Sequence, residues 1–175
     1  MYKRQALKKR LQSIYRNSKE LLNLVNQLLD FRRLEVHGEK LFLVKGNIAE
    51  FVSSVKSSFD YLAQEKGISF EMDDKIAEDL YVSFDREKMQ KVLNNLLSNA
   101  FKFTSAGGVV TITLDTCKEP DGVQYFRLCV KDTGAGIPRK NLSHIFERFY
   151  QVKEEKDKIG SGIGLHLVKE YVELH

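Results

Sequence analysis

The stretch Asp132-Thr133-Gly134-Ala135-Gly136-Ile137 decides how this sequence is interpreted. It follows directly on residues 126–131, whose composition predicts a strand. A carboxylate at the end of a strand can accept a hydrogen bond from the exocyclic amine of a base. Glycines beside it let the backbone approach an aromatic ring, because they carry no Cβ atom. An ordinary turn explains the segment equally well when it is taken alone.

A second motif lies in residues 90–104, largely within a helix that we predict over residues 86–101. Asn95, Asn99 and Lys102 fall at i, i+4 and i+7, so they share one stripe of that helix. Amide oxygens can hold a hard, hydrated cation, and a lysine can meet phosphate as a point charge. The alternative is a solvated polar face, which fits less well because asparagine is a weak helix former.

The third motif is the glycine loop Gly160-Ser161-Gly162-Ile163-Gly164-Leu165, which precedes an apolar helix predicted to start near Gly162. Glycines at a helix start expose unpaired N–H groups, where phosphate binds readily. Leu165 stands where a G-x-G-x-x-G loop needs its third glycine, and no G-x-x-x-x-G-K-[ST] sequence occurs. The fourth motif is the aromatic segment Phe146-Glu147-Arg148-Phe149-Tyr150-Gln151. The charged run 153–158 after it predicts a loop that closes as a lid.

The N-terminal residues carry an apolar seam that predicts one long helix ending near Gly38. A second apolar row, Tyr15, Leu22 and Leu29, widens the seam, which suits a four-helix bundle better than a two-stranded coil. The alternative is an ordinary amphipathic helix packed on its own domain. The seam alternates by four and three residues and consists of Leu7, Leu11, Ile14, Ser18, Leu21, Val25 and Leu28.

Between these motifs, helices and strands alternate, and two strands are linked as a hairpin through the turn 118–122. This order predicts an α+β fold with a mixed sheet that helices cover on one face. Strands are predicted over residues 41–44, 68–72, 80–84, 109–114 and 125–131, and further helices over 48–64 and 142–146.

Composition excludes several classes of protein. No segment approaches the roughly 18 apolar residues of a membrane span, and no signal peptide is visible, so we expect a soluble protein. Residues 1–36 hold nine Lys and Arg against three Asp and Glu, which leaves 19 basic and 21 acidic residues in the remainder. The main domain therefore offers no basic surface for nucleic acid. Cys117 and Cys129 fit no zinc or redox spacing and are expected to be buried free thiols of a reducing cytoplasm.

Together, the four motifs resemble the N, G1, F and G2 boxes of the histidine kinase branch of the GHKL ATPases. The resemblance implies the Bergerat fold, an α/β sandwich, in residues 37–175, and a domain that binds ATP and Mg²⁺ and transfers the γ-phosphoryl group to a histidine. Phe103 departs from the tyrosine that many relatives carry. Other readings remain open: another GHKL ATPase or serine kinase, or a degenerate nucleotide-binding interaction module.

Roles for individual residues come from this resemblance. Asn99 would coordinate Mg²⁺, Asn95 and Lys102 would lie beside the phosphates, and Asp132 would recognise the adenine amine. Catalysis would rest on Asn95, Asn99 and Lys102. The other residues expected to contact the nucleotide are Phe103, Gly134, Gly136, Ile137, Phe146, Phe149, Gly160, Gly162, Gly164 and Leu165.

The resemblance extends to residues 21–35, which look like the end of the second helix of a dimerisation and phosphoacceptor module. It implies that residues 1–36 are an incomplete piece of this module and that the last strands of the catalytic domain are missing. None of His37, His144, His166 and His175 has the neighbours of a phosphoacceptor, so the acceptor is expected outside this chain. Expected partners are the phosphoacceptor helix, a response-regulator receiver domain and a second copy in a full-length homodimer. The chain would be the cytoplasmic portion of a membrane-anchored bacterial sensor.

Overall fold

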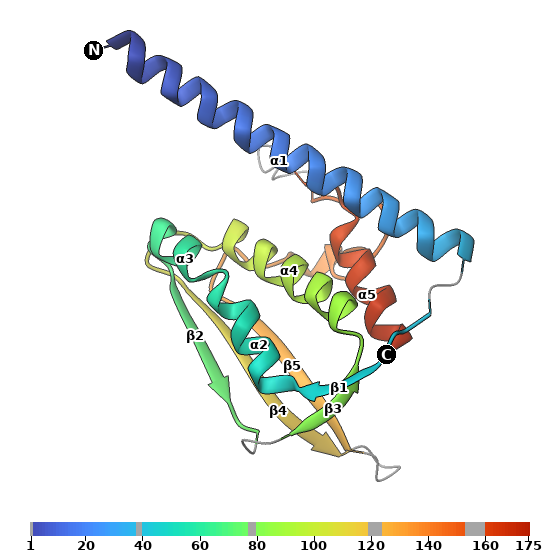
Figure 1. Cartoon of the computed structure of the whole chain (residues 1–175). Helices are drawn as coiled ribbons and strands as arrows, with labels where there is room; N and C mark the ends of the chain where they lie inside the picture. Colours follow the sequence, from blue (N-terminus) through green and yellow to red (C-terminus); the bar gives the residue numbers. More distant parts are fainter. Residues whose placement is uncertain (1, 38–39, 77–79, 119–123, 153–159) are drawn as a thin grey trace.

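A computed structural model describes residues 2–37, 40–76, 80–118, 124–152 and 160–175 (Figure 1). One long helix precedes a body of strands and shorter helices. The helices are α1 (Tyr2–His37), α2 (Ile48–Ser57), α3 (Asp60–Lys66), α4 (Arg86–Phe103) and α5 (Gly164–Leu174), with a 3₁₀ turn η1 at Arg139–Asn141. The strands are β1 (Val44–Asn47), β2 (Ser69–Asp74), β3 (Tyr81–Phe84), β4 (Val109–Lys118) and β5 (Gln124–Asp132).

The strands form two sheets. In the larger sheet β2 runs parallel to β4, and β4 runs antiparallel to β5, with Val110 opposite Asp132. The smaller sheet is the antiparallel pair β1 and β3. The expected mixed sheet and hairpin are therefore present, although the hairpin strands are longer than predicted and residues 119–123 of the turn lie outside the described residues. Asp132 ends β5, as expected.

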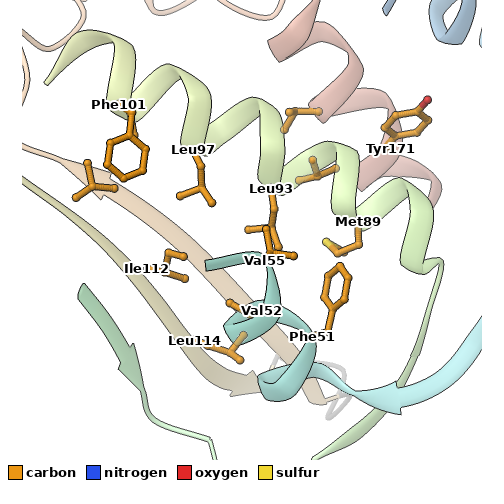
Figure 2. Packing of buried hydrophobic residues seen from close by; sticks show 14 of the residues in the cluster. Phe51, Val52, Val55, Met89, Leu93, Leu97, Phe101, Ile112, Leu114 and Tyr171 are labelled. Carbon is orange, nitrogen blue, oxygen red and sulfur yellow. The ribbon is translucent and has the colours of Figure 1, made fainter. Parts of the chain in front are cut away.

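A single apolar core lies between the large sheet and helices α2 and α4 (Figure 2). Three alternate residues in the first half of β4 point into this core, namely Val110, Ile112 and Leu114, so helices cover one face of this part of the strand. Leu93 and Leu97 of α4 are fully buried against them. The polar stripe of α4 is thereby turned away from the core, as its periodicity predicts.

The start of α4 is fixed by a buried ion pair. Asp85 caps the helix, its Oδ1 accepting a hydrogen bond from Lys88 N at 3.0 Å. Its Oδ2 accepts from Lys88 Nζ at 3.0 Å and from Phe42 N at 2.9 Å. Burial alone would raise the pKa of Asp85, but the bonds from Phe42 and Lys88 and the charge of Lys88 lower the pKa to about 2. This residue therefore ties the segment before β1 to the helix of the functional motif.

Acid should remove the contribution of this pair. The folded pKa of Asp85 lies below the ordinary value of 3.8, so the stabilisation is complete above that value and disappears as pH falls through about 2. Between pH 5 and pH 2 we expect the free energy of unfolding of the wild type to fall by about 2 kcal/mol more than that of Asp85→Asn. Urea unfolding at both pH values measures this difference. Equal losses in the two proteins would contradict the assignment.

Several predicted boundaries were wrong. The helix predicted over 48–64 is divided after Ser57. The backbone N–H groups of Ser58 and Phe59 donate to carbonyl oxygens three residues earlier, and the Ser58 hydroxyl donates to Val55 O. Strand β1 begins at Val44, later than predicted. Helix α5 begins at Gly164, because Gly162 adopts a left-handed φ of 70° that no helix contains.

Three further expectations concern the last part of the chain and the cysteines. Turns occupy residues 142–146, where a helix was predicted, and they follow the 3₁₀ turn η1. Cys129 is exposed and Cys117 is half-buried, so the expectation of two buried thiols was wrong. The lid was predicted between Phe149 and Gly160, and most of this segment, residues 153–159, lies outside the described residues.

Helix α1 lies across α5 and extends well beyond the body (Figure 1). It ends at His37, as predicted. Its seam does not pack on the body: Leu11, Ile14, Leu21, Val25 and Leu28 are all exposed. Among the described residues, no helix is long and apolar enough to span a membrane. Contact with the body is made instead by a different face, which includes the buried Phe31 and the half-buried Leu34.

Candidate functional site

The polar stripe of α4 forms the floor of the candidate site. Asn95 Nδ2 donates to Lys91 O at 2.8 Å, so its Oδ1 is the atom that points away from the helix. Asn99, one turn further, is half-buried and makes no side-chain hydrogen bond to any described residue. Lys102 Nζ lies 4.9 Å from the centre of the Phe103 ring. One helix thus presents two amides and an ammonium group on the same side, as its sequence predicts.

The glycine loop runs along this stripe. A Cβ atom on Gly164 would lie 2.6 Å from Asn95 Oδ1, and one on Gly160 would lie 3.0 Å from Lys102 Nζ. Only glycine allows such an approach without movement of the amide. Helix α5 therefore begins directly beside Asn95, and the unpaired N–H groups of its first turn lie at the polar stripe.

The end of β5 contacts the other end of α4. A Cβ atom on Gly134 would lie 2.5 Å from Phe103 O, so glycine is needed for this contact as well. Asp132 is exposed, and its Oδ1 accepts a hydrogen bond from Gly134 N at 2.8 Å. No described residue bonds to its Oδ2, which leaves this oxygen able to accept from a base. Gly136 has a φ of 71° with open space around it.

The aromatic segment packs against the glycine loop. Phe149 has a φ of 61°, unusual for a residue with a side chain, and its N–H donates to Gly162 O at 3.0 Å. A Cβ atom on Gly162 would lie 2.7 Å from the carbonyl carbon of Phe149. Gln151 Nε2 donates to Gly160 O at 2.6 Å. These contacts hold both ends of the intervening segment together.

The structure therefore brings the four motifs together. The glycine loop and the end of β5 both contact α4, and the aromatic segment contacts the glycine loop at Gly162. Ile137 and Phe146 are exposed, and no contact between their side chains and the other predicted site residues is described. Leu165 is half-buried in the first turn of α5.

Sequence reasoning missed the contribution of α1 to the site. Gln27 Nε2 donates to Asn95 Oδ1 at 3.0 Å, and Ser161 Oγ donates to Gln27 Oε1 at 2.6 Å. Phe31 contacts the edge of Phe149, with ring centroids 6.4 Å apart. Gln27 is a polar residue beside the seam and Phe31 follows its last leucine, so neither belonged to the predicted seam.

Two ion pairs flank Phe31. Lys91 Nζ lies 2.9 Å from Asp30 Oδ1, and Arg148 Nη1 lies 2.6 Å from Glu35 Oε1. Although burial lowers the pKa of Lys91, hydrogen bonds to Asp30 and Glu87 outweigh it, and the pKa is raised. Helix α1 is thus held against the body by the Phe31 side chain and by the ion pairs of Asp30 and Glu35, one on each side of it in the sequence.

The donors suit a hard cation and an anion more than a soft metal. Among the described residues there is no cluster of His, Cys, Asp and Glu that could hold a metal. Amide oxygens of Asn95 and Asn99 are ligands that Mg²⁺ accepts, while the first turn of α5 and Lys102 suit phosphate. The exposed Asp132, beside two glycines, suits a base with an amine.

Comparison with known proteins agrees with this arrangement. Residues 84–175 match the family described as histidine kinase-, DNA gyrase B- and HSP90-like ATPases. The match covers more than half of the chain and includes all four motifs. The chain belongs to this family.

Relatives place it more narrowly. The chain is 40% identical over 171 residues to hybrid signal transduction histidine kinase D of Dictyostelium discoideum, covering 97% of this chain and 11% of that protein. The structure of full-length ShkA in complex with AMPPNP matches with a TM-score of 0.77 and 28% identity, covering 95% of this chain and 34% of that one. The complex of histidine kinase ThkA with response regulator TrrA matches with a TM-score of 0.66 and 26% identity, covering 87% of this chain and 45% of that one.

The body therefore matches the ATPase domain found in histidine kinases, as expected from the resemblance of its motifs. Its mixed α/β architecture is the one found in the catalytic domains of such kinases. The chain spans about a tenth of the length of the Dictyostelium discoideum protein and less than half of the length of the ShkA and ThkA chains.

Proposed function

We propose that the chain binds Mg·ATP between α4, the end of β5 and the start of α5, and delivers the γ-phosphoryl group to a histidine outside this chain. The observation that supports this proposal best is the close approach of three glycines to α4. Gly160 and Gly164 lie against the α4 stripe, and Gly134 lies against its last turn. Residues far apart in sequence thus lie close together, and the site that they would form has groups suited to a base at one end and groups suited to phosphate at the other.

The adenine would lie at the end of β5. Asp132 accepts from its amine, and Gly134, Gly136 and Ile137 leave room for the ring. Exposure of Asp132 and its unbonded Oδ2 support this role. Phe103 contributes an aromatic face at the adjoining end of α4. Phe146 and Phe149 anchor the segment that precedes the predicted lid.

The phosphates would lie along the α4 stripe towards α5. Lys102 and the backbone of the glycine loop neutralise and orient them, and Asn95 lies beside them. Asn99 holds Mg²⁺, which when bound neutralises charge that develops on the transferred phosphoryl group. Its half-buried amide, without a bond to any described residue, supports this choice over Asn95, whose two amide atoms are engaged. Positioning and charge neutralisation supply most of the rate.

The accepting imidazole would come from another segment. His166 is buried beside Phe31, with Nδ1 3.2 Å from Phe146 O, and His144 Nδ1 lies 2.7 Å from Glu147 Oε1. His175 Nε2 accepts from Asp85 N, far along the body at the other end of α4. Each of these three side chains has a structural partner, which supports an acceptor elsewhere. The side chain of His37 lies outside the described residues.

We further propose that residues 1–36 are the second helix of the dimerisation and phosphoacceptor module and that 37–175 are the catalytic domain. The exposed seam of α1 supports a homodimeric four-helix bundle in the full-length protein. A receiver domain is the proposed downstream partner, since the similar kinase ThkA forms a complex with a response regulator. The parent protein would be a membrane-anchored sensor with this region on the cytoplasmic side.

Nucleotide preference tests the base assignment. The chain should bind ATP more tightly than GTP, because guanine presents a carbonyl where adenine presents an amine. Asp132→Asn should weaken ATP binding by roughly 1–3 kcal/mol, the scale of a polar partner left unsatisfied. Calorimetric titration of each nucleotide, with and without Mg²⁺, measures both effects.

Asp74→Asn is the matched control. Asp74 also ends a strand, is exposed, and accepts a hydrogen bond from the N–H two residues later, at 3.0 Å from Ile76 N. It lies outside the site, so its substitution should leave ATP affinity unchanged. Equal affinity of the wild type for ATP and GTP, or an equal loss of ATP affinity in the two variants, would contradict the proposed role of Asp132.

A further inference from the structure

The side chain of Gln27 joins two parts of the proposed nucleotide site to each other. It reaches from α1 and uses both ends of its amide: Nε2 donates to Asn95 Oδ1 at 3.0 Å, and Oε1 accepts from Ser161 Oγ at 2.6 Å. Its neighbours Asn26 and Leu28 are exposed. Gln27 therefore makes contacts that its helix could not make at an adjacent position.

These contacts lie at the phosphate end of the site. Gln27 Nε2 is 3.8 Å from the position that a Cβ atom of Gly164 would occupy, in the first turn of α5. Asn95 Nδ2 donates to Lys91 O, so its acceptor Oδ1 is the amide atom that faces away from α4 towards the proposed site. Gln27 already holds that atom. Ser161 lies within the glycine loop, and its hydroxyl is likewise directed to Gln27.

We propose that Gln27 is a competitor for the phosphate end of the nucleotide site. Its amide holds Asn95 and Ser161 and must release them before the phosphates can contact them. The inference rests on the proposed function, because it needs nucleotide to bind at this place. By linkage, the docked Gln27 weakens nucleotide binding, and bound nucleotide weakens the docked Gln27 by the same factor.

The remaining contacts of α1 do not compete in this way. The Asp30 and Glu35 ion pairs and the packing of Phe31 involve Lys91, Arg148 and Phe149, and none of them uses the side chain of Asn95 or Ser161. Removal of the Gln27 side chain should therefore leave α1 docked while freeing the site. Alanine is the suitable replacement, because it keeps the helix and removes both ends of the amide.

The experiment compares AMPPNP affinity in the wild type, Gln27→Ala and Asn26→Ala, each in the presence of Mg²⁺. Gln27→Ala should bind roughly 5- to 30-fold more tightly than the wild type, within the usual range of coupling between sites. Asn26→Ala removes an amide from the adjacent, exposed position and should bind as the wild type does. Circular dichroism verifies that both variants keep the helix.

A second readout follows Gln27 directly. In the wild type, the side-chain NH₂ resonance of Gln27 is assigned by its absence in Gln27→Ala. When AMPPNP is added, its chemical shift should move towards that of a solvent-exposed amide, whereas the resonance of Asn26 stays unchanged. If the wild type binds AMPPNP but Gln27→Ala has the same affinity, the competition is overturned and the proposed function stands. If no protein of the set binds AMPPNP, both are overturned.

Discussion

Incubated with γ-labelled ATP and Mg²⁺, the chain should bind nucleotide yet remain unlabelled, and should then label a separate protein segment that carries a phosphoacceptor histidine. Phosphoryl transfer requires an imidazole placed in line with the γ-phosphate. His144 and His166 lie near the aromatic segment, but each is held by a structural contact. Proximity alone does not aim a nucleophile. The expected product is acid-labile and base-stable, as a phosphohistidine is.

This result is checked by autoradiography after acid and base treatment, with mapping of the labelled residue. The chain without acceptor and the acceptor without chain are the two controls. Base-stable label on His37, His144, His166 or His175 of the unextended chain would contradict an external acceptor. Absence of label on every acceptor tested, from a chain that binds ATP, would instead favour the alternative of a nucleotide-binding interaction module.

Gly162→Ala should destabilise the fold far more than Gly136→Ala, although the two glycines have nearly the same backbone conformation. Their φ angles are 70° and 71°, so each alanine pays the left-handed penalty of about 1–2 kcal/mol. A Cβ atom on Gly136 would meet nothing within 4 Å, whereas one on Gly162 would lie 2.7 Å from the Phe149 backbone. Backbone cannot rotate away as a side chain can. We expect a loss of about 3 kcal/mol or more for Gly162→Ala.

Urea unfolding of both variants measures the difference, and the Gly136 variant provides the reference for the conformational penalty alone. Equal losses would mean that the aromatic segment moves away from the glycine loop at no cost, contrary to the described contact. Because Phe149 itself has a positive φ, the strain should spread to its neighbours, and ATP affinity should fall together with stability.

The sequence allowed prediction of the elements whose signals are local. The stripe of α4, the hairpin of β4 and β5, and the position of Asp132 follow from side-chain period and turn residues. The break at Ser58 could not be foreseen, since neither proline nor glycine occurs there and the cause is a hydroxyl bond to Val55 O. The beginning of α5 was misplaced because Gly162 takes its conformation from a contact with Phe149.

The part of the site that came from α1 was not predictable in the same way. The Gln27 bond to Asn95 joins residues 68 apart in sequence, and that to Ser161 joins residues 134 apart. Such contacts depend on how the helix lies against the body, which no periodicity encodes. The leucines of the seam give a strong periodic pattern, but they mark the face of α1 that remains exposed.

The two faces of α1 have a practical consequence for chimeric sensors. The leucines of the seam offer apolar area that many helices can match, whereas Gln27, Asp30 and Glu35 have specific partners in the body. A junction placed before residue 24 exchanges part of α1 but keeps every one of these pairs. A junction after residue 36 exchanges the whole of α1 and separates the body from the helix that fits it. Exchange of input modules should therefore succeed or fail according to a dozen residues of α1.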